Sequence, residues 1–126
     1  MGRTQRQQTG DAAEEQARRH LAAEGGHHCL AQNFHARGGE LDLVTLEGEV
    51  LVFVEVRARS GTDFGAPEET IGHRKRGRLV QAAQAFLRRY PQHSHRFCRF
   101  DVVAVDDNGL RWIPDAFQPD QSGFWS

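Results

Sequence analysis

A chain of 126 residues with 38% hydrophobic residues has enough apolar side chains for one core, so we expect a single domain over 1–126. The formal net charge of −1 excludes a general polycation, and an anionic partner would therefore have to be held by a local basic patch. No apolar run is as long as a membrane span, and the first residues lack the apolar core of a signal peptide. We therefore expect a cytoplasmic protein with no membrane contact. The composition of the two ends predicts an ordered core over about 9–117, with a flexible N-terminus and C-terminal tail.

The hydrophobic pattern predicts an α/β protein. In the first predicted helix, Ala13, Ala17 and Leu21 form an apolar stripe at four-residue spacing. The expected elements are a helix over 11–24, strands over 27–34, 40–46 and 50–58, a helix over 73–90, a strand over 97–105 and a short strand over 110–113. The order helix, three strands, helix, one or two strands predicts a central mixed sheet with helices packed on it.

The second and third strands carry acidic residues within apolar runs. A two-residue turn at Glu47-Gly48 predicts a hairpin between these strands. The resulting register places Asp42 opposite Phe53 and Glu40 opposite Glu55, with the diagonal pair Asp42 and Glu55 on the same face of the sheet. A different turn length would change this register.

The face with Glu40, Asp42 and Glu55 also carries Arg57. Three carboxylates on one face repel one another unless a positive charge lies between them. A Mg²⁺ or Mn²⁺ ion, which prefers oxygen ligands, would remove this repulsion. An ion pair between Arg57 and Glu55 would be a second solution, and solvated charges on an edge strand would be a third. The sequence leaves all three open.

Glu14 has two interpretations. It lies at the border of the apolar stripe of the first helix, from where it could reach the carboxylates of the sheet. The pattern Asp11-x-x-Glu14 also resembles a capping box, in which Glu14 would only satisfy backbone donors at the start of the helix.

Several motifs together resemble the small bacterial YraN-like family, over roughly residues 8–117. They are Gly10-x-x-x-Glu14-x-x-Ala17-x-x-x-Leu21, Gly39-Glu40-Leu41-Asp42-Leu43-Val44, Phe53-Val54-Glu55-Val56-Arg57-x-Arg59, Lys75-x-x-Arg78-Leu79 and Arg99-Phe100-Asp101-Val102-Val103. That family is similar to the PD-(D/E)xK nucleases and, among them, to archaeal Holliday-junction resolvases.

The resemblance implies a restriction-endonuclease-like fold and a set of site residues. Asp42 falls at the metal-binding aspartate of those nucleases, Glu55 at their second acid, and Glu14 at the helix acid that many of them have. Arg57 falls where they have a lysine, and an arginine stays charged and cannot act as a base, although it can stabilise a phosphate. The only lysine of the chain, Lys75, could supply the missing amine if the second helix lies against the site, or it could be a solvated side chain of that helix.

A dense basic run, His73-Arg74-Lys75-Arg76-x-Arg78, begins the second helix. Together with Arg59, and with Arg57, Arg96 and Arg99 as further candidates, it could bind DNA phosphates without sequence specificity. The alternative is the solvated face of an amphipathic helix. His27-His28-Cys29 and His93-x-His95-x-x-Cys98 could in principle hold zinc, but neither has a finger spacing.

Two functional classes follow from these residues. The acids Glu14, Asp42 and Glu55 favour a Mg²⁺- or Mn²⁺-dependent DNA endonuclease, acting on branched or single-stranded DNA, with Asp42, Glu55 and Arg57 as catalytic residues. Arg57 in the lysine position favours the alternative, a catalytically inactive nuclease-like module that binds nucleic acid.

Overall fold

The computed structural model describes the backbone of residues 5–58 and 71–119 and, from residue 10 onward, their side chains. The elements in chain order are α1 (Gln5–Gly25), β1 (His28–Ala36), β2 (Gly39–Glu47), β3 (Val50–Ala58), α2 (His73–Arg89), the 3₁₀ turn η2 (Pro91–His93), β4 (Cys98–Asp106) and β5 (Gly109–Phe117). The expected order of helices and strands is therefore confirmed. Residues 59–70, between β3 and α2, lie outside the described residues.

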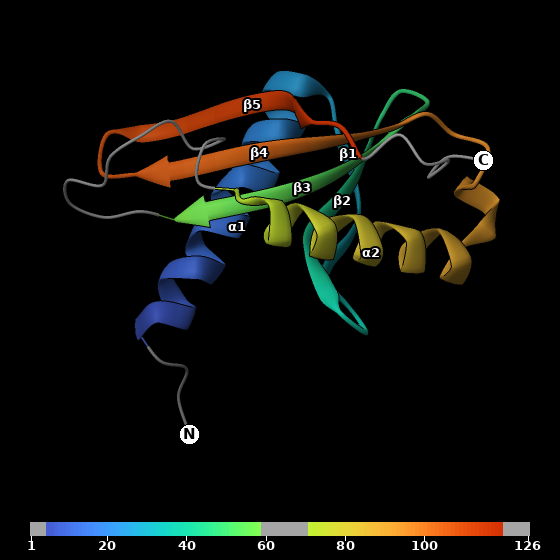
Figure 1. The fold of residues 1–126 in the computed structure, drawn as a ribbon. Coiled ribbons are helices and arrows are strands. Elements are labelled where there is room, and N and C mark those ends of the chain that lie inside the picture. The colour runs from blue at the N-terminus through green and yellow to red at the C-terminus, as the bar shows by residue number, and fades with distance from the viewer. Residues whose placement is uncertain (1–4, 59–70, 120–126) are drawn as a thin grey trace.

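The five strands form one mixed sheet in the order β1-β2-β3-β4-β5 (Figure 1). β3 and β4 run parallel, and the other neighbouring pairs run antiparallel. Parallel strands need a long crossover connection, and here α2 lies within that connection. The crossover brings α2 back onto the sheet, where it packs mainly on β2 and β1.

The two helices cover opposite faces of the sheet. Figure 1 shows α1 behind the sheet and α2 in front of it. Val52 and Val54 of β3 pack with Ala17 and Leu21 of α1, whereas Phe53 between them packs on the α2 side. Because β3 is buried on both faces, its sequence is a continuous apolar run rather than an alternating one. Glu55 interrupts this run at a buried position.

The first helix and the last strand are longer than we expected. The helix expected from residue 11 begins at Gln5, and so it includes part of the N-terminus that we expected to be flexible; residues 1–4 and 120–126 lie outside the described residues. The last strand is nine residues long and continues through Pro114. β5 is an edge strand, where a proline without an N–H is tolerated, and its pairing with β4 is irregular between Phe100 and Val102.

The register expected for the hairpin of β2 and β3 was wrong by two residues. Leu46 pairs with Leu51 instead of Glu49, because the turn consists of Gly48 and Glu49. Gly48 has a φ of 60°, a left-handed conformation that glycine adopts without strain and that tight hairpins require. A shift of two residues leaves every side chain on its original face, because side chains alternate with a period of two.

The pairing of β2 with β3 ends at Leu43 and Val54, although β2 continues along β1 to Gly39. Leu41 packs in the core on the α2 side, whereas Leu43 packs in the core on the α1 side. The expected alternation, with Leu41 and Leu43 on one face, is therefore interrupted at Asp42. The two strands separate at this point, and the carboxylates lie in the opening.

Candidate functional site

Asp42 lies in the opening between β2 and β3. The backbone N–H of Val56 donates a hydrogen bond of 2.8 Å to Oδ2 of Asp42, in a position where a strand partner would normally offer a carbonyl. Continuing the register by one residue beyond Leu43 and Val54 makes Asp42 and Glu55 direct partners. The expected pairs Asp42–Phe53 and Glu40–Glu55 are therefore wrong, and Asp42 lies closer to Glu55 than a diagonal neighbour would.

Glu55 is a buried carboxylate, 6% exposed, that lies between two cations. Its Oε2 is 3.3 Å from Nζ of Lys75 and 3.7 Å from a guanidinium nitrogen of Arg57. The ion pair between Arg57 and Glu55 that we considered from the sequence is therefore present. Lys75 is also at the site, rather than on the solvated face of α2. The side-chain amine of the only lysine in the chain therefore reaches Glu55.

Burial and the neighbouring charge of Glu55 raise the pKa of Asp42 to about 8. Removal from water is the largest cause, followed by repulsion from Glu55 and a hydrogen bond with it, while the N–H of Val56 opposes the shift. This coupling requires the two carboxyl groups to lie together, as the site hypothesis expected. Asp42 therefore keeps its proton at a higher pH than an ordinary aspartic acid does.

Glu14 of α1 lies near the same carboxylates. Burial raises its pKa, a hydrogen bond from the side chain of Asn33 lowers it, and the charges of Asp11, Glu40 and Glu55 raise it further. The capping-box alternative is wrong because α1 begins at Gln5, which places Glu14 well inside the helix. Its position follows from the buried stripe of Ala13 and Ala17 on either side of it.

Asn33 is a site residue that the sequence analysis missed. It lies on β1 with a φ of 53°, a conformation that asparagine tolerates better than most residues. Its side chain bonds to Glu14. A single asparagine in a weakly patterned strand has no sequence signal that distinguishes it from a turn residue. Glu40, by contrast, is exposed and bonds to His35 Nδ1 at 2.9 Å, so it lies at the rim.

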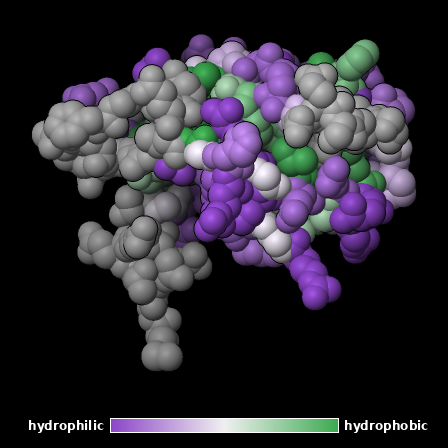
Figure 2. All heavy atoms as spheres, in the orientation of Figure 1, coloured by the Kyte–Doolittle hydropathy of each residue, from purple (hydrophilic) through white to green (hydrophobic). Residues whose placement is uncertain are grey.

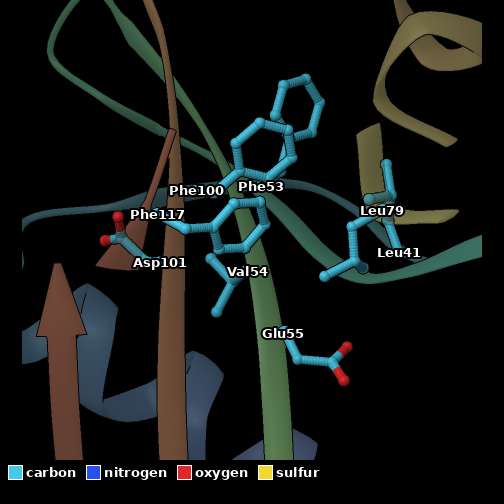
Figure 3. A pocket seen from close by; sticks show the side chains of 8 residues that line it. All are labelled: Leu41, Phe53, Val54, Glu55, Leu79, Phe100, Asp101 and Phe117. Carbon is cyan, nitrogen blue, oxygen red and sulfur yellow. The ribbon is translucent and has the colours of Figure 1, made fainter. Parts of the chain in front are cut away.

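Glu55 and Asp101, the two buried acids of the central strands, belong to different sites. In Figure 3 the carboxylates of Glu55 and Asp101 point away from each other. Oδ1 of Asp101 accepts hydrogen bonds from Arg99 Nε at 2.8 Å and from the N–H of Asp115 at 2.9 Å, and Oδ2 accepts from Arg99 at 3.0 Å and from Trp112 Nε1 at 2.9 Å. Asp101 is therefore fully paired and holds β4 to β5.

Arg99 was a candidate for the phosphate-binding surface, and the structure assigns it elsewhere. Besides Asp101, it donates to Glu47 at 2.8 Å, and Glu47 in turn lies 3.2 Å from His27. Hydrogen bonds with Arg99 lower the pKa of Glu47. Arg96 likewise bonds to Glu49, so neither arginine belongs to the basic run of α2.

The side chains of the basic run point in three different directions. Arg74 and Arg78 are exposed, Lys75 turns inward to Glu55, and Arg76 is partly buried. Nε of Arg76 donates to the carbonyl of Ile71 at 2.9 Å. Figure 2 shows hydrophilic residues across the middle of the face where α2 lies. Arg59, the remaining candidate, lies outside the described residues.

The close packing of α2 on β2 explains why Lys75 reaches Glu55. A Cβ atom added to Gly39 would collide with the backbone carbonyl of Arg78, so this contact requires glycine on β2. Leu79 is fully buried on the same face of α2, one turn after Lys75. The helix can therefore approach the strand closely enough for a lysine side chain to reach β3.

No group of three or more His, Cys, Asp or Glu side chains within residues 10–58 and 71–119 is arranged to hold a metal ion. The chemistry of Asp42 and Glu55 nevertheless fits a hard cation, because two adjacent carboxyl groups offer oxygen ligands and no cation partner of Asp42 is seen among the described residues. Glu14 is a further carboxylate, close enough to raise the pKa of Asp42. The soft-ligand alternative is weaker, since buried His27 is bonded to Thr45 at 2.8 Å and to Glu47.

These features define a class of protein, a single-domain mixed α/β protein with a half-buried aspartate, a buried glutamate and a lysine that meet beside its central strand. Within the described residues, neither helix is long and apolar enough to cross a membrane. The model of the uncharacterised protein family UPF0102 matches residues 13–105, and the chain belongs to this family. This is the YraN-like family that the motifs indicated.

Relatives in several bacteria are similar over nearly their whole length. The chain is 47% identical over 112 residues to a UPF0102 protein of Pseudomonas fluorescens (strain Pf0-1), covering 87% of this chain and 92% of the relative. It is 44% identical over 116 residues to one of Janthinobacterium, covering 92% of each chain. A third, from Enterobacter, is 42% identical over 123 residues, covering 94% of this chain and 91% of the relative.

Proposed function

We propose that this protein is a metal-dependent endonuclease that hydrolyses phosphodiester bonds of DNA, on branched or single-stranded substrates. The observation that carries the proposal is the meeting of Asp42, Glu55 and Lys75 at the point where β2 leaves β3. Two acids and an amine are the set of groups that PD-(D/E)xK nucleases use, although here the amine comes from α2 and not from the strand that carries the second acid. The order of helices and strands is also consistent with the restriction-endonuclease-like fold of those enzymes.

Asp42 and Glu55 would hold Mg²⁺ or Mn²⁺, and Glu14 would add a ligand directly or through water. The ion would supply a water of lowered pKa and would stabilise the negative charge that builds on the phosphate. Arg57, which stays charged, would steady the phosphate rather than take a proton. Lys75 would orient the carboxylate of Glu55 by donating a hydrogen bond to it, and it compensates for the arginine at the usual lysine position.

One observation favours the second candidate, a nucleic-acid-binding module without turnover. Glu55 already has two cationic partners, Lys75 and Arg57, which neutralise it without a metal. The two candidates are distinguished by incubating the purified protein with branched and single-stranded DNA, in Mn²⁺ or in EDTA. Cleavage that requires Mn²⁺ supports the endonuclease, whereas binding without cleavage under both conditions supports the module.

A metal at the carboxylates should raise the melting temperature of the protein. Millimolar Mn²⁺ is expected to increase it by several degrees, because a ligand that binds only the folded state adds about 2.7 kcal/mol at a hundred times its Kd. Glu55→Gln should abolish the increase, and Glu24→Gln, at an exposed position of α1, should retain it. The measurement is a thermal melt with and without Mn²⁺. An unchanged melting curve of the wild type would support the neutralised ion-pair alternative.

The exposed arginines of α2 should dominate the salt dependence of DNA binding. Replacing both Arg74 and Arg78 with alanine is expected to weaken binding and to reduce the slope of log affinity against log salt by up to about 0.9 for each phosphate that is no longer neutralised. The matched control removes two arginines at the other end of the helix, Arg88 and Arg89. A salt titration measures both, and equal slopes for the two double variants would show that the phosphates bind elsewhere.

A further inference from the structure

A groove runs between α2 and the end of β5, beside the carboxylate site. Its volume is about 530 Å³, which lies within the range of about 300–1,000 Å³ typical of clefts that bind small ligands. The residues that carry the inference are Arg76, Gly77, Val80, Gln81, Phe117 and Gln118. None of the described residues that line the groove is acidic, and two of them, His73 and Arg76, are basic, so the groove suits an anionic ligand.

The guanidinium of Arg76 is the stacking surface of the groove, because the Phe117 ring is buried and already packs on Phe100 and against Arg76. The guanidinium carbon of Arg76 lies 5.3 Å from the centroid of the Phe117 ring, and its Nε is bonded to the carbonyl of Ile71. Two separate contacts therefore hold this guanidinium in place. Unpaired bases stack on aromatic rings and on guanidinium planes, and each such contact is independent of sequence. A held guanidinium offers a base a stacking partner at a low cost in side-chain entropy.

The polar groups of the groove suit the edge of a base. Gln81 and Gln118 are exposed, and an amide has donors and an acceptor. The amide nitrogen of Gln118 donates to Asp115, so Gln118 offers a base mainly its carbonyl oxygen. A base presents donors and acceptors along its edge, which are free only when the base is unpaired. Gly77 has no side chain, which leaves space between the amide of Gln81 on α2 and the ring of Phe117.

The groove and the carboxylate site lie on two sides of the first turns of α2. Lys75 reaches Glu55, and its neighbour Arg76 reaches Phe117. Phe117 stacks on Phe100 of β4, with ring centroids 4.7 Å apart, and β4 is the direct neighbour of β3, which carries Glu55. A DNA strand that crosses the start of α2 would therefore meet both places.

We propose that this groove holds an unpaired nucleobase of the strand whose backbone lies at the carboxylate site. This inference rests on the proposed nuclease function, and it narrows the substrate to DNA with an unpaired nucleotide at the site. A base inside a duplex is stacked and paired and cannot enter the groove, whereas a base in a single-stranded segment can. The groove would therefore direct the enzyme to DNA with unpaired nucleotides next to the scissile bond.

The test fills the groove at Gly77. A Cβ at this position meets no atom within 4 Å, so Gly77→Phe places a ring in the groove without a backbone clash. Gly77→Ala is the matched control, because it gains helix propensity in the same way and leaves the groove open. A second variant, Arg76→Lys, keeps the charge and removes the planar stacking surface.

Binding is measured in EDTA with three labelled probes: a duplex, the same duplex with a short single-stranded flap, and that duplex with an abasic flap. We expect wild type and Gly77→Ala to prefer the flap duplex about tenfold over the plain duplex. Gly77→Phe and Arg76→Lys should lose this preference and keep their affinity for the plain duplex. The wild type should bind the abasic flap duplex no more tightly than the plain duplex. Gly77→Phe should bind the abasic and the normal flap duplex with equal affinity.

The inference is overturned if Gly77→Phe retains the flap preference, or if wild type binds the abasic flap as tightly as the normal one. A parallel cleavage assay in Mn²⁺ separates this inference from the proposed function. A flap preference that depends on Gly77, without cleavage, would reject the endonuclease and keep the groove. Cleavage with a preference insensitive to Gly77 would reject only the groove, and binding to none of the probes would reject both.

Discussion

Asp42→Asn is expected to reduce Mn²⁺-dependent cleavage of DNA by at least about a hundredfold to a thousandfold, the range seen when one group that stabilises transition-state charge is removed. The amide can still accept the hydrogen bond that the N–H of Val56 donates, so the local backbone should stay in place. What the variant loses is a charged oxygen ligand at the point where the scissile phosphate would lie. DNA affinity should change little, because the phosphate contacts come mainly from the basic residues of α2.

Gels of branched and single-stranded substrates measure this prediction, and Asp106→Asn is the matched control, at an exposed turn between β4 and β5. The Asp42 variant should melt no lower than the wild type in EDTA. Since burial and Glu55 hold the pKa of Asp42 above its ordinary value, ionising this group costs the folded state free energy near neutral pH, and the amide removes that cost. If Asp42→Asn cuts as fast as the wild type, the activity is a contaminant or lies elsewhere on the protein.

Asp101→Ala is expected to lower the free energy of unfolding by about 3 kcal/mol or more, the largest stability effect that we expect from a single substitution. The carboxylate is 1% exposed and accepts four hydrogen bonds. Removing it leaves the partly buried guanidinium of Arg99, the indole N–H of Trp112 and the backbone N–H of Asp115 without this acceptor. Removing one partner of a buried pair costs about 3–5 kcal/mol. Arg99 keeps its contact with Glu47, so we expect the lower end of this range, with much of the loss coming from the N–H groups of Trp112 and Asp115 that are left without their acceptor.

Urea unfolding followed by circular dichroism measures the loss. Asp106→Ala, at the exposed last residue of β4, loses only the hydrogen bond from the N–H of Asn108 and should change stability by about 1 kcal/mol or less. Asp101→Asn should fall between the two, since an amide oxygen can still accept some of these hydrogen bonds. A loss below about 1 kcal/mol for Asp101→Ala would mean that the network around Arg99 rearranges instead of losing its bonds.

The sequence predicted the elements and the two central acids because local patterns encode them. The apolar run around Phe53 indicated a strand, and Glu55 within that run indicated an acid of the candidate site. The pairing register was wrong by two residues, yet Asp42 and Glu55 still met, because a shift of two preserves the face of every side chain. The motifs also identified the family, which the comparison confirmed.

The roles of the remaining charged residues depend on distances across the fold, which a linear pattern does not contain. Lys75 and Arg76 are adjacent in a basic run, but the approach of α2 to Gly39 directs one to Glu55, and the position of β5 directs the other to Phe117. Arg99 reads as one more basic residue until β4 and β5 place it against Asp101. The opening between β2 and β3 is likewise a tertiary feature, because β2 follows β1 after its pairing with β3 has ended. Local sequence therefore determined which residues lie on strands and helices, whereas the packing of α1 and α2 on the sheet decided which charges meet, since an ion pair or a hydrogen bond forms only when its atoms lie within about 4 Å of each other.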